Sequence, residues 1–191
     1  MIVVRRPQDA EARLADAVMC CPRCGSALAK WGYAQTHRPR ARCRDGDRAP
    51  AAGAVPHCAT THILLPTALQ PRRADTTEVI GTALAHKANG LGFQRIAARM
   101  GRAESTVRRW LRRATDKHLT WACQQGATRL IQLALDAFTE IRYAGNQLRH
   151  TLTMLIAAAY WDRRRCGFED PPWTLISMYT RGPLLALPRS G

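Results

Sequence analysis

The sequence predicts a mainly α-helical protein that carries a small β-structured, zinc-ribbon-like module at its N-terminus. Apolar residues recur at helical spacing within residues 71–118, which predicts three short helices in succession. The first 70 residues instead combine a closely spaced cysteine pair with two short extended runs, 28–35 and 60–65. We therefore expect three parts: the zinc-ribbon-like module (1–70), a three-helix unit (71–118) and a helical C-terminal region (119–191).

The segment 92–113 has the pattern of two helices joined by a tight turn. Four apolar residues form one stripe at i, i+3, i+4 and i+7: Phe93, Ile96, Ala97 and Met100. Gly101 ends this helix, because glycine readily adopts a positive φ. A second helix then directs four residues inward: Val107, Trp110, Leu111 and Ala114. The pattern predicts a helix-turn-helix; the alternative is an ordinary helical hairpin with a solvated arginine face.

A further helix precedes this pair. Asp75 to Glu78 read as an N-cap with a reciprocal glutamate at N3, and Gly90 and Gly92 read as the stop signal. Its apolar face consists of Val79, Ile80, Ala83 and Leu84. Three helices within about 40 residues make a homeodomain-like, trihelical unit, the usual minimum for a helix-turn-helix that binds DNA.

With its apolar residues inward, the second helix of the pair presents a basic face, as a recognition helix does in the major groove of double-stranded DNA. The candidate DNA-binding residues are Ser105, Thr106, Arg108, Arg109, Arg112 and Arg113. We expect Arg108 to read a base and Arg113 to contact a phosphate. The charge agrees with a polyanionic partner: the chain has a formal net charge of +15, and residues 92–118 hold eight basic and two acidic side chains.

The N-terminal cysteine pair has the spacing of a zinc knuckle. Cys21 and Cys24 stand two residues apart in a CPRCG sequence, so their thiolates can bind one tetrahedral Zn²⁺. The other ligands must come from four downstream residues: Cys43, His57, Cys58 and His62. Cys58 is the strongest of these, because it precedes an extended run as Cys24 does. No second CxxC exists, since Val55 stands three residues before Cys58.

For the fourth ligand we prefer Cys43, with His57 as the runner-up, and we expect His62 to make a hydrogen bond in the core. The alternative is a set of buried or incidental cysteines that hold no metal. In that context Cys20 would be an extra buried thiol. The isolated cysteines Cys123 and Cys166 are expected to be packing residues.

Taken together, these motifs resemble a known family. The CPRCG knuckle is followed by Trp31-Gly32, then by the C-x-x-TH-x-LLP run of 58–66, then by PRRAD (71–75) and GFQRIAARMGR-x-x-STVRRWLRR. This order is similar to the actinobacterial zinc-ribbon plus helix-turn-helix proteins, a family of unknown function that is often labelled transposase-like or insertion-element-like. In that family the second knuckle usually reads RCxxC, from which Val55 departs here.

The C-terminal region is expected to be helical. Residues 119–127 read as a connection, and Thr128 to Ile141 and Asn146 to Arg165 as two helices with apolar faces. Pro171 and Pro172 open a short helix that ends near Tyr179. A homodimer is one way in which these apolar faces could be covered.

Catalysis is not expected. A three-carboxylate transposase needs acidic residues gathered from distant strands, whereas Asp136 and Glu140 fall in a helical pattern. The longest apolar run is far shorter than a membrane span, and the N-terminus lacks a signal-peptide core, so we expect a cytoplasmic protein. The function predicted is sequence-specific DNA binding of the transcriptional-regulator kind. The alternatives are a transposition accessory protein or truncated transposase with a transposase partner, and a structural RNA- or protein-binding ribbon.

Overall fold

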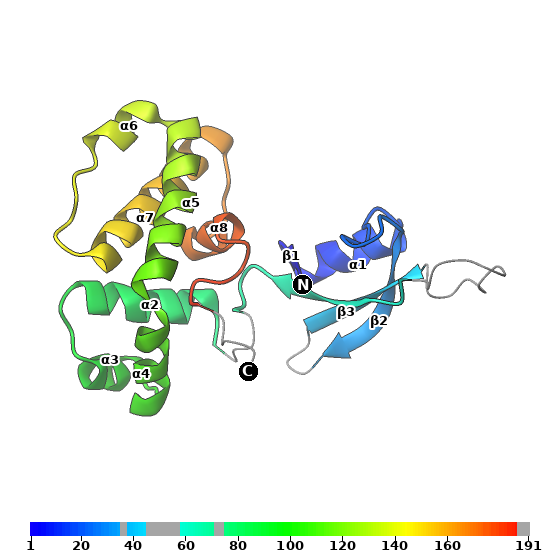
Figure 1. Ribbon diagram of the computed structural model, residues 1–191, viewed down its shortest axis with the longest axis horizontal. Helices are drawn as coiled ribbons and strands as arrows, with labels where there is room; N and C mark the ends of the chain where they lie inside the picture. The colour runs from blue at the N-terminus through cyan, green and yellow to red at the C-terminus, as the bar shows by residue number, and fades with distance from the viewer. Residues whose placement is uncertain (35–37, 45–57, 71–74, 187–191) are drawn as a thin grey trace. The chain divides into compact units, whose positions relative to one another are not determined.

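The chain folds as two compact units, Met1–Thr67 and Ala68–Gly191, which are described separately (Figure 1). The computed structural model describes residues 1–34, 38–44, 58–70 and 75–186. Among these residues, no helix is long and apolar enough to cross a membrane. The first unit is a small sheet with one helix, and the second is helical, so the protein is mainly α-helical with a small N-terminal sheet.

The first unit contains a four-stranded sheet in the order β1-β4-β3-β2. Its elements are β1 (Ile2–Val4), α1 (Pro7–Ala15), β2 (Leu28–Ala34), β3 (Arg38–Cys43) and β4 (Thr61–Pro66). β1 pairs with β4 in parallel, and the other neighbours are antiparallel. The two predicted extended runs are confirmed as β2 and β4. β1, α1 and β3 were not expected from the sequence, so the unit is more than a plain ribbon.

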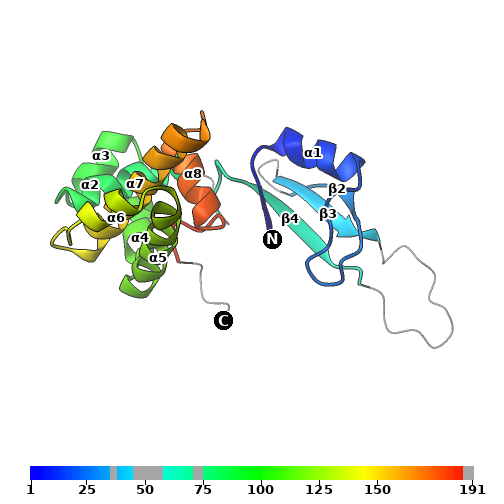
Figure 2. The same ribbon diagram turned by 90° about the horizontal axis from the view of Figure 1, so that it is seen from above.

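Helix α1 covers one face of this sheet (Figures 1 and 2). Its buried residues Ala10 and Leu14 belong to one hydrophobic cluster with Leu28, Ala41 and Leu64 from the strands. Pro7 occupies the first turn of the helix, where its missing N–H costs nothing. The α1 side of the sheet is therefore the core side of the unit.

The second unit contains seven helices among the residues that the structure describes. They are α2 (Thr77–Ala88), α3 (Phe93–Met100), α4 (Glu104–Arg113), α5 (Asp116–Leu133), α6 (Leu135–Glu140), α7 (Gln147–Cys166) and α8 (Pro172–Tyr179). α2, α3 and α4 are the three predicted helices, and α8 lies where the proline pair predicted it. One hydrophobic cluster spans the predicted boundary at residue 118, because it joins Ile80, Ile96 and Trp110 to Leu155 and Ile176.

The turn between α3 and α4 is closed by Gly101. This residue has φ 60° and ψ 41°, the left-handed conformation expected of a glycine C-cap. Ile96 and Ala97 of α3 and Val107 and Trp110 of α4 are all buried, as the periodicity predicted. The cap of α2 differs from the prediction by one residue.

That cap is Thr76, whose side chain accepts a hydrogen bond from Val79 N. Glu78 is therefore the second helical residue, and the predicted reciprocal bond from N3 is not the one formed. Asp75 instead accepts a hydrogen bond from Arg102 Nε at 2.8 Å, in the turn between α3 and α4. This ion pair ties the turn to the start of α2.

The expected connection at 119–127 is wrong, because these residues are helical in α5. Thr115 caps the helix by accepting a hydrogen bond from His118 N. Leu119, Ala122 and Gly126 then form a buried stripe that packs on α7, so tertiary burial overrides the weak local signal. The predicted helix 128–141 is interrupted at Ala134, where φ is −158° and ψ is 79°.

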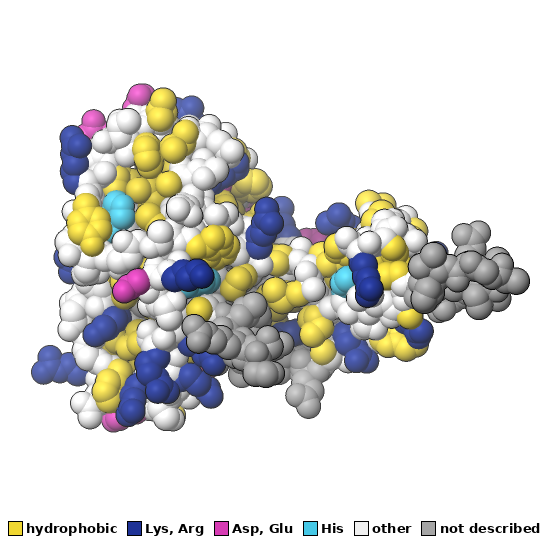
Figure 3. Space-filling view, in the orientation of Figure 1, with side chains coloured by type: hydrophobic (Ala, Val, Ile, Leu, Met, Phe, Trp, Pro, Cys, Tyr) yellow, Lys and Arg dark blue, Asp and Glu magenta, His cyan; other side chains and the backbone are white. Residues whose placement is uncertain are grey.

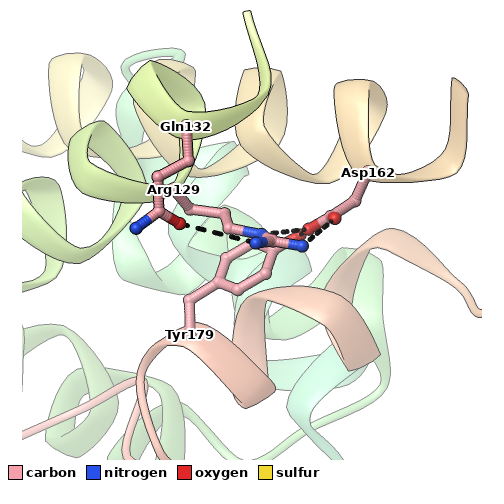
Figure 4. A network of polar contacts seen from close by, with 4 residues as sticks. All are labelled: Arg129, Gln132, Asp162 and Tyr179. Carbon is pink, nitrogen blue, oxygen red and sulfur yellow. Dashed lines mark hydrogen bonds and ion pairs between the residues drawn. The ribbon is translucent and has the colours of Figure 1, made fainter. Parts of the chain in front are cut away.

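A buried polar network joins α5, α7 and α8 (Figure 4). Asp162 is 1% exposed and pairs with Arg129, whose Nη2 lies 2.6 Å from Asp162 Oδ1. The Tyr179 hydroxyl donates a hydrogen bond to the same carboxylate. Burial by itself raises the pKa of Asp162, but the bonds from Arg129 and Tyr179 outweigh burial and lower that pKa. The charged carboxylate of α7 therefore links α5 and α8 through these hydrogen bonds.

The segment after α8 packs back on the three-helix unit. Gln70 is buried, and its side-chain nitrogen donates to Thr77 Oγ1 and to the carbonyl of Gly182. Its side-chain oxygen accepts from Leu184 N. Leu184 and Leu185 are both buried in the cluster that contains the α2–α4 core. The start of α2 and the end of the described chain thus stabilise each other.

Candidate nucleic-acid interface and metal centre

Helix α4 separates apolar from basic residues by its own periodicity. Val107 and Trp110 are completely buried against α2 and α3. Arg108, Arg109 and Arg112 are exposed, as are Glu104 and Ser105 in the first turn. At about 100° per residue, Arg108 and Arg112 lie on one outward ridge with Arg109 beside them.

The basic surface extends beyond α4 to its neighbours. Figure 3 shows Lys and Arg side chains gathered over α3 and α4. From α3, Arg95 and Arg99 are exposed as well. The guanidinium of Arg108 lies 6.0 Å from the centre of the Phe93 ring, so α3 also helps to orient this arginine.

Two of the predicted DNA-binding residues are less exposed to solvent than the others. Arg113 is half-buried, and its Nη1 donates to the carbonyl of Ala186 at 3.4 Å. The backbone N–H of Ala186 in turn donates a hydrogen bond to the carbonyl of Arg113 at 3.1 Å. Thr106 is also partly buried, and its N–H bonds to Ala103 O in the first turn. Arg113 therefore contacts the C-terminal segment of its own chain.

The second candidate site is a cluster of four cysteines in the first unit. The sulfur atoms of Cys21, Cys24, Cys43 and Cys58 all lie within 4.8 Å of one another. Cys21 Sγ is 3.8 Å from Cys58 Sγ, and Cys24 Sγ is 3.3 Å from Cys43 Sγ. All four are free thiols rather than disulfides. The four cysteines can hold a metal ion.

The local fold explains how the cluster forms. The knuckle turns at Gly25, which has φ 76°, and two backbone bonds close it: Gly25 N to Cys21 O and Cys21 N to Ser26 O, both 2.8 Å. Cys43 stands at the end of β3, and its partner across the ladder is Leu28 of β2. Strand pairing therefore returns Cys43 to the knuckle that immediately precedes β2.

The distances fit a tetrahedral metal centre. Zinc–thiolate bonds of about 2.3 Å at tetrahedral angles separate the sulfurs by about 3.8 Å, close to the spacing observed. A metal ion in this position would need only small shifts of the side chains. Hydrogen bonding with the Thr60 side chain and backbone lowers the pKa of the Cys58 thiol to about 6.

His62 is next to the cluster rather than in it. Its ring is buried, and Nε2 lies 3.3 Å from Cys21 Sγ, within hydrogen-bonding distance. An N–H at this atom would donate to the thiolate and hold it in place. This buried contact agrees with the expectation that His62 makes a hydrogen bond in the core. His57 lies outside the described residues.

The remaining cysteines differ from what the sequence predicted. Cys20 is exposed rather than buried, and Cys166 is exposed rather than a packing residue. Cys123 does pack, against the cluster that contains Leu130 and Met154. Burial raises the pKa of the Cys123 thiol, as expected in apolar surroundings.

A row of arginines on β3 was not predicted from the sequence. Arg38, Arg40 and Arg42 alternate with buried residues along this strand. The alternation is visible in the sequence as RPRARC, but Pro39 within the run argues against a strand, because proline cannot donate to the ladder. The Asp75–Arg102 ion pair was likewise unpredicted, because its partners are 27 residues apart.

Comparison with known proteins identifies one part of the chain. Residues 77–118, which span α2, α3, α4 and the first residues of α5, match the family model of the homeodomain-like domain. No curated protein and no solved structure matches the chain. The match agrees with the three-helix arrangement of α2, α3 and α4 and suggests DNA binding by this part of the chain.

Proposed function

We propose that this protein is a sequence-specific, double-stranded-DNA-binding protein of the transcriptional-regulator kind, in which α4 is the recognition helix. The observation that carries the proposal is the division of α4 into a buried side, Val107 and Trp110, and an exposed side with three arginines. A recognition helix needs such a division, because one side must anchor the helix while the other enters the major groove.

The exposed serine and arginines of α4 each have a role that suits their chemistry. Arg108 is the base reader, since a guanidinium matches the paired acceptors O6 and N7 of guanine. Arg109 and Arg112 contact bases or phosphates beside it. Ser105 contacts a phosphate at the helix N-terminus, where backbone N–H groups and the helix dipole favour an anion.

The cysteine cluster is proposed to hold Zn²⁺ as a structural site. Four thiolates are a ligand set typical of closed, tetrahedral zinc centres without catalytic function. The bound ion would join the knuckle to the end of β3 and to Cys58, which precedes the start of β4 by three residues. These parts are otherwise distant in sequence. Its contribution is to the folding of the first unit.

Catalysis is not part of this proposal. Asp136 and Glu140 belong to the six-residue helix α6, and Thr139 bonds there to the carbonyl of Asp136. Within the described ranges, three or more His, Cys, Asp or Glu residues come close enough to hold a metal at the four cysteines and at no carboxylate cluster. We expect the protein with Mg²⁺ or Mn²⁺ neither to nick nor to join supercoiled DNA. Cleavage that Asp136→Ala abolishes would contradict this part.

The experiment that tests DNA reading is a selection of bound sequences from random duplex DNA, followed by variants on the selected site. Arg108→Ala should relax the preference at one base position and weaken binding about 5- to 150-fold, equivalent to about 1 to 3 kcal/mol. The matched control is Arg163→Ala, which removes the same charge from an exposed position at the end of α7. Equal effects of the two variants, or none, would contradict a reading role for α4.

A further inference from the structure

The sheet of the first unit has a second face, opposite to α1, with a distinct composition. Along β3 the side chains alternate, so that Pro39, Ala41 and Cys43 are buried while Arg38, Arg40 and Arg42 are partly exposed. Successive residues of a strand point to opposite faces. Because Ala41 and Cys43 belong to the core cluster with α1, the three arginines lie on the other face.

The neighbouring strands add two exposed hydrophobic side chains to this face. Ala29 pairs with Arg42 across the ladder, and Trp31 follows Ala29 by two residues. On the other side, Ile63 of β4 pairs with Arg40. Trp31 is 46% exposed and Ile63 is 41% exposed. We call these five residues, Trp31, Arg38, Arg40, Arg42 and Ile63, the open sheet face.

Trp31 and Arg42 form a stacked pair on the open sheet face. The centre of the Arg42 guanidinium lies 4.5 Å from the centre of the Trp31 ring, close enough for a cation–π interaction. This contact fixes the orientation of the indole while leaving almost half of the side chain accessible. An aromatic ring held in this way is a preformed platform for stacking.

The acidic residues described in this unit lie on one side of the sheet only. The acidic residues described in this unit are Asp9, Glu11 and Asp16, and all three belong to α1 or its C-cap. Glu11 there is neutralised locally, because it accepts hydrogen bonds from Tyr33 and Lys30. No acidic side chain among the described residues lies on the strands of the open sheet face. Of the five residues of the open sheet face, three are cationic, one is aromatic and one, Ile63, is aliphatic.

We infer that the open sheet face binds single-stranded DNA. Proteins that hold an unpaired strand combine a basic surface for the phosphates with exposed aromatic rings on which bases stack. The arginines of β3 repeat every second residue, at a spacing of about 6.8 Å, and can follow a strand backbone. A duplex hides the faces of its bases, so it would leave Trp31 and Ile63 without a use.

This activity is separate from duplex reading by α4 and does not depend on it. The two sites lie in different units of the chain, and different residues form them. A protein with both would hold a duplex site through the helices and an unpaired strand through the sheet. Loss of one activity through mutation should leave the other measurable.

The test uses the full-length, metal-loaded protein and a fluorescein-labelled thymidine oligonucleotide of about 16 nucleotides, the upper site size for a single such surface. Trp31→Ala should weaken binding about 5- to 100-fold, through loss of base stacking. Tyr33→Ala is the matched control. Tyr33 is also 46% exposed on β2, but the strand register shifts between Lys30 and Tyr33, and Tyr33 bonds to Glu11 on the α1 side. The control should bind as the wild type does.

A second pair of variants tests the charge. Arg40→Ala should lower the slope of log affinity against log salt by about 0.7, the value for one phosphate of a single strand. Arg13→Ala removes the same charge from the exposed side of α1 and should leave the slope unchanged. Arg108→Ala should weaken duplex binding while single-strand binding persists, which separates this inference from the proposed function.

Three results would overturn the inference. The first is unchanged binding of the thymidine oligonucleotide by Trp31→Ala. The second is an equal loss in Trp31→Ala and Tyr33→Ala, with both proteins shown by circular dichroism and zinc content to be folded. The third is a loss by Trp31→Ala of duplex binding alone, which would assign the open sheet face to duplex DNA.

Discussion

Gly81 of α2 lies directly against the indole ring of Trp173 of α8. A Cβ atom at position 81 would stand 2.5 Å from ring carbons of Trp173, well inside a normal contact. The absence of a side chain at Gly81 therefore lets α8 pack against the first helix of the three-helix unit. The residues beyond 118 are part of the same packed body as the helix-turn-helix.

This contact predicts the effect of a single methyl group. Gly81→Ala should lower the free energy of unfolding by about 1 to 3 kcal/mol, because overpacking outweighs the gain in helix propensity. The measurement is urea unfolding followed by circular dichroism at 222 nm. Adding Trp173→Leu to Gly81→Ala should recover part of the loss, since the smaller side chain makes room. If the two changes were simply additive, the contact would not be the cause.

The cysteine cluster predicts a metal content that depends on Cys43. The purified protein should hold about one equivalent of Zn²⁺, and Cys43→Ser should lower the zinc content and loosen the first unit. Cys20→Ser is the matched control, because Cys20 is adjacent to the knuckle but exposed and outside the cluster. Zinc is measured by mass spectrometry after dialysis. A fully ordered first unit in metal-free protein would contradict a structural zinc site.

Arg112 and Arg113 should differ although they are adjacent. Arg112 is exposed, so Arg112→Ala should weaken duplex binding and lower the salt slope by about 0.9 if it contacts one phosphate. Arg113 bonds to the carbonyl of Ala186, so Arg113→Ala should chiefly lower the free energy of unfolding, by about 0.5 to 1.5 kcal/mol. Binding titrations at several salt concentrations and urea unfolding separate the two effects. A loss of salt slope in Arg113→Ala with unchanged stability would restore Arg113 to a phosphate-contacting role.

The Asp162 network predicts a loss of stability in acid. Because the folded pKa of Asp162 lies below its ordinary value of 3.8, its stabilising contribution is complete above that value. The contribution declines as the pH falls through the lower, folded pKa. Asp162→Asn should therefore destabilise the protein at neutral pH, and the difference from the wild type should shrink in strong acid. Thermal unfolding across this pH range measures the difference in stability between the two proteins. If that difference stayed constant in acid, the ionised carboxylate of Asp162 would not be its source.

The helix-turn-helix could be predicted because its information is local. The stripe through Ile96 and Ala97, the turn at Gly101 and the anchors Val107 and Trp110 all lie within one short segment. Helical periodicity and the left-handed conformation of glycine depend on neighbours a few residues away. The knuckle at Cys21 and Cys24 is local in the same sense, and so are the two strands that were predicted.

Tertiary structure decided what depends on distant partners. Cys43 reaches the knuckle only because β3 pairs with β2, and the open sheet face exists only because β3 alternates against a core formed with α1. Residues 119–127 become helical because they bury Leu119, Ala122 and Gly126 against α7. In each case the deciding free energy comes from burial against residues far away in the chain. A short stretch of sequence does not show which distant residues will bury it. It does show helical periodicity, helix caps and turn residues, because these depend on near neighbours.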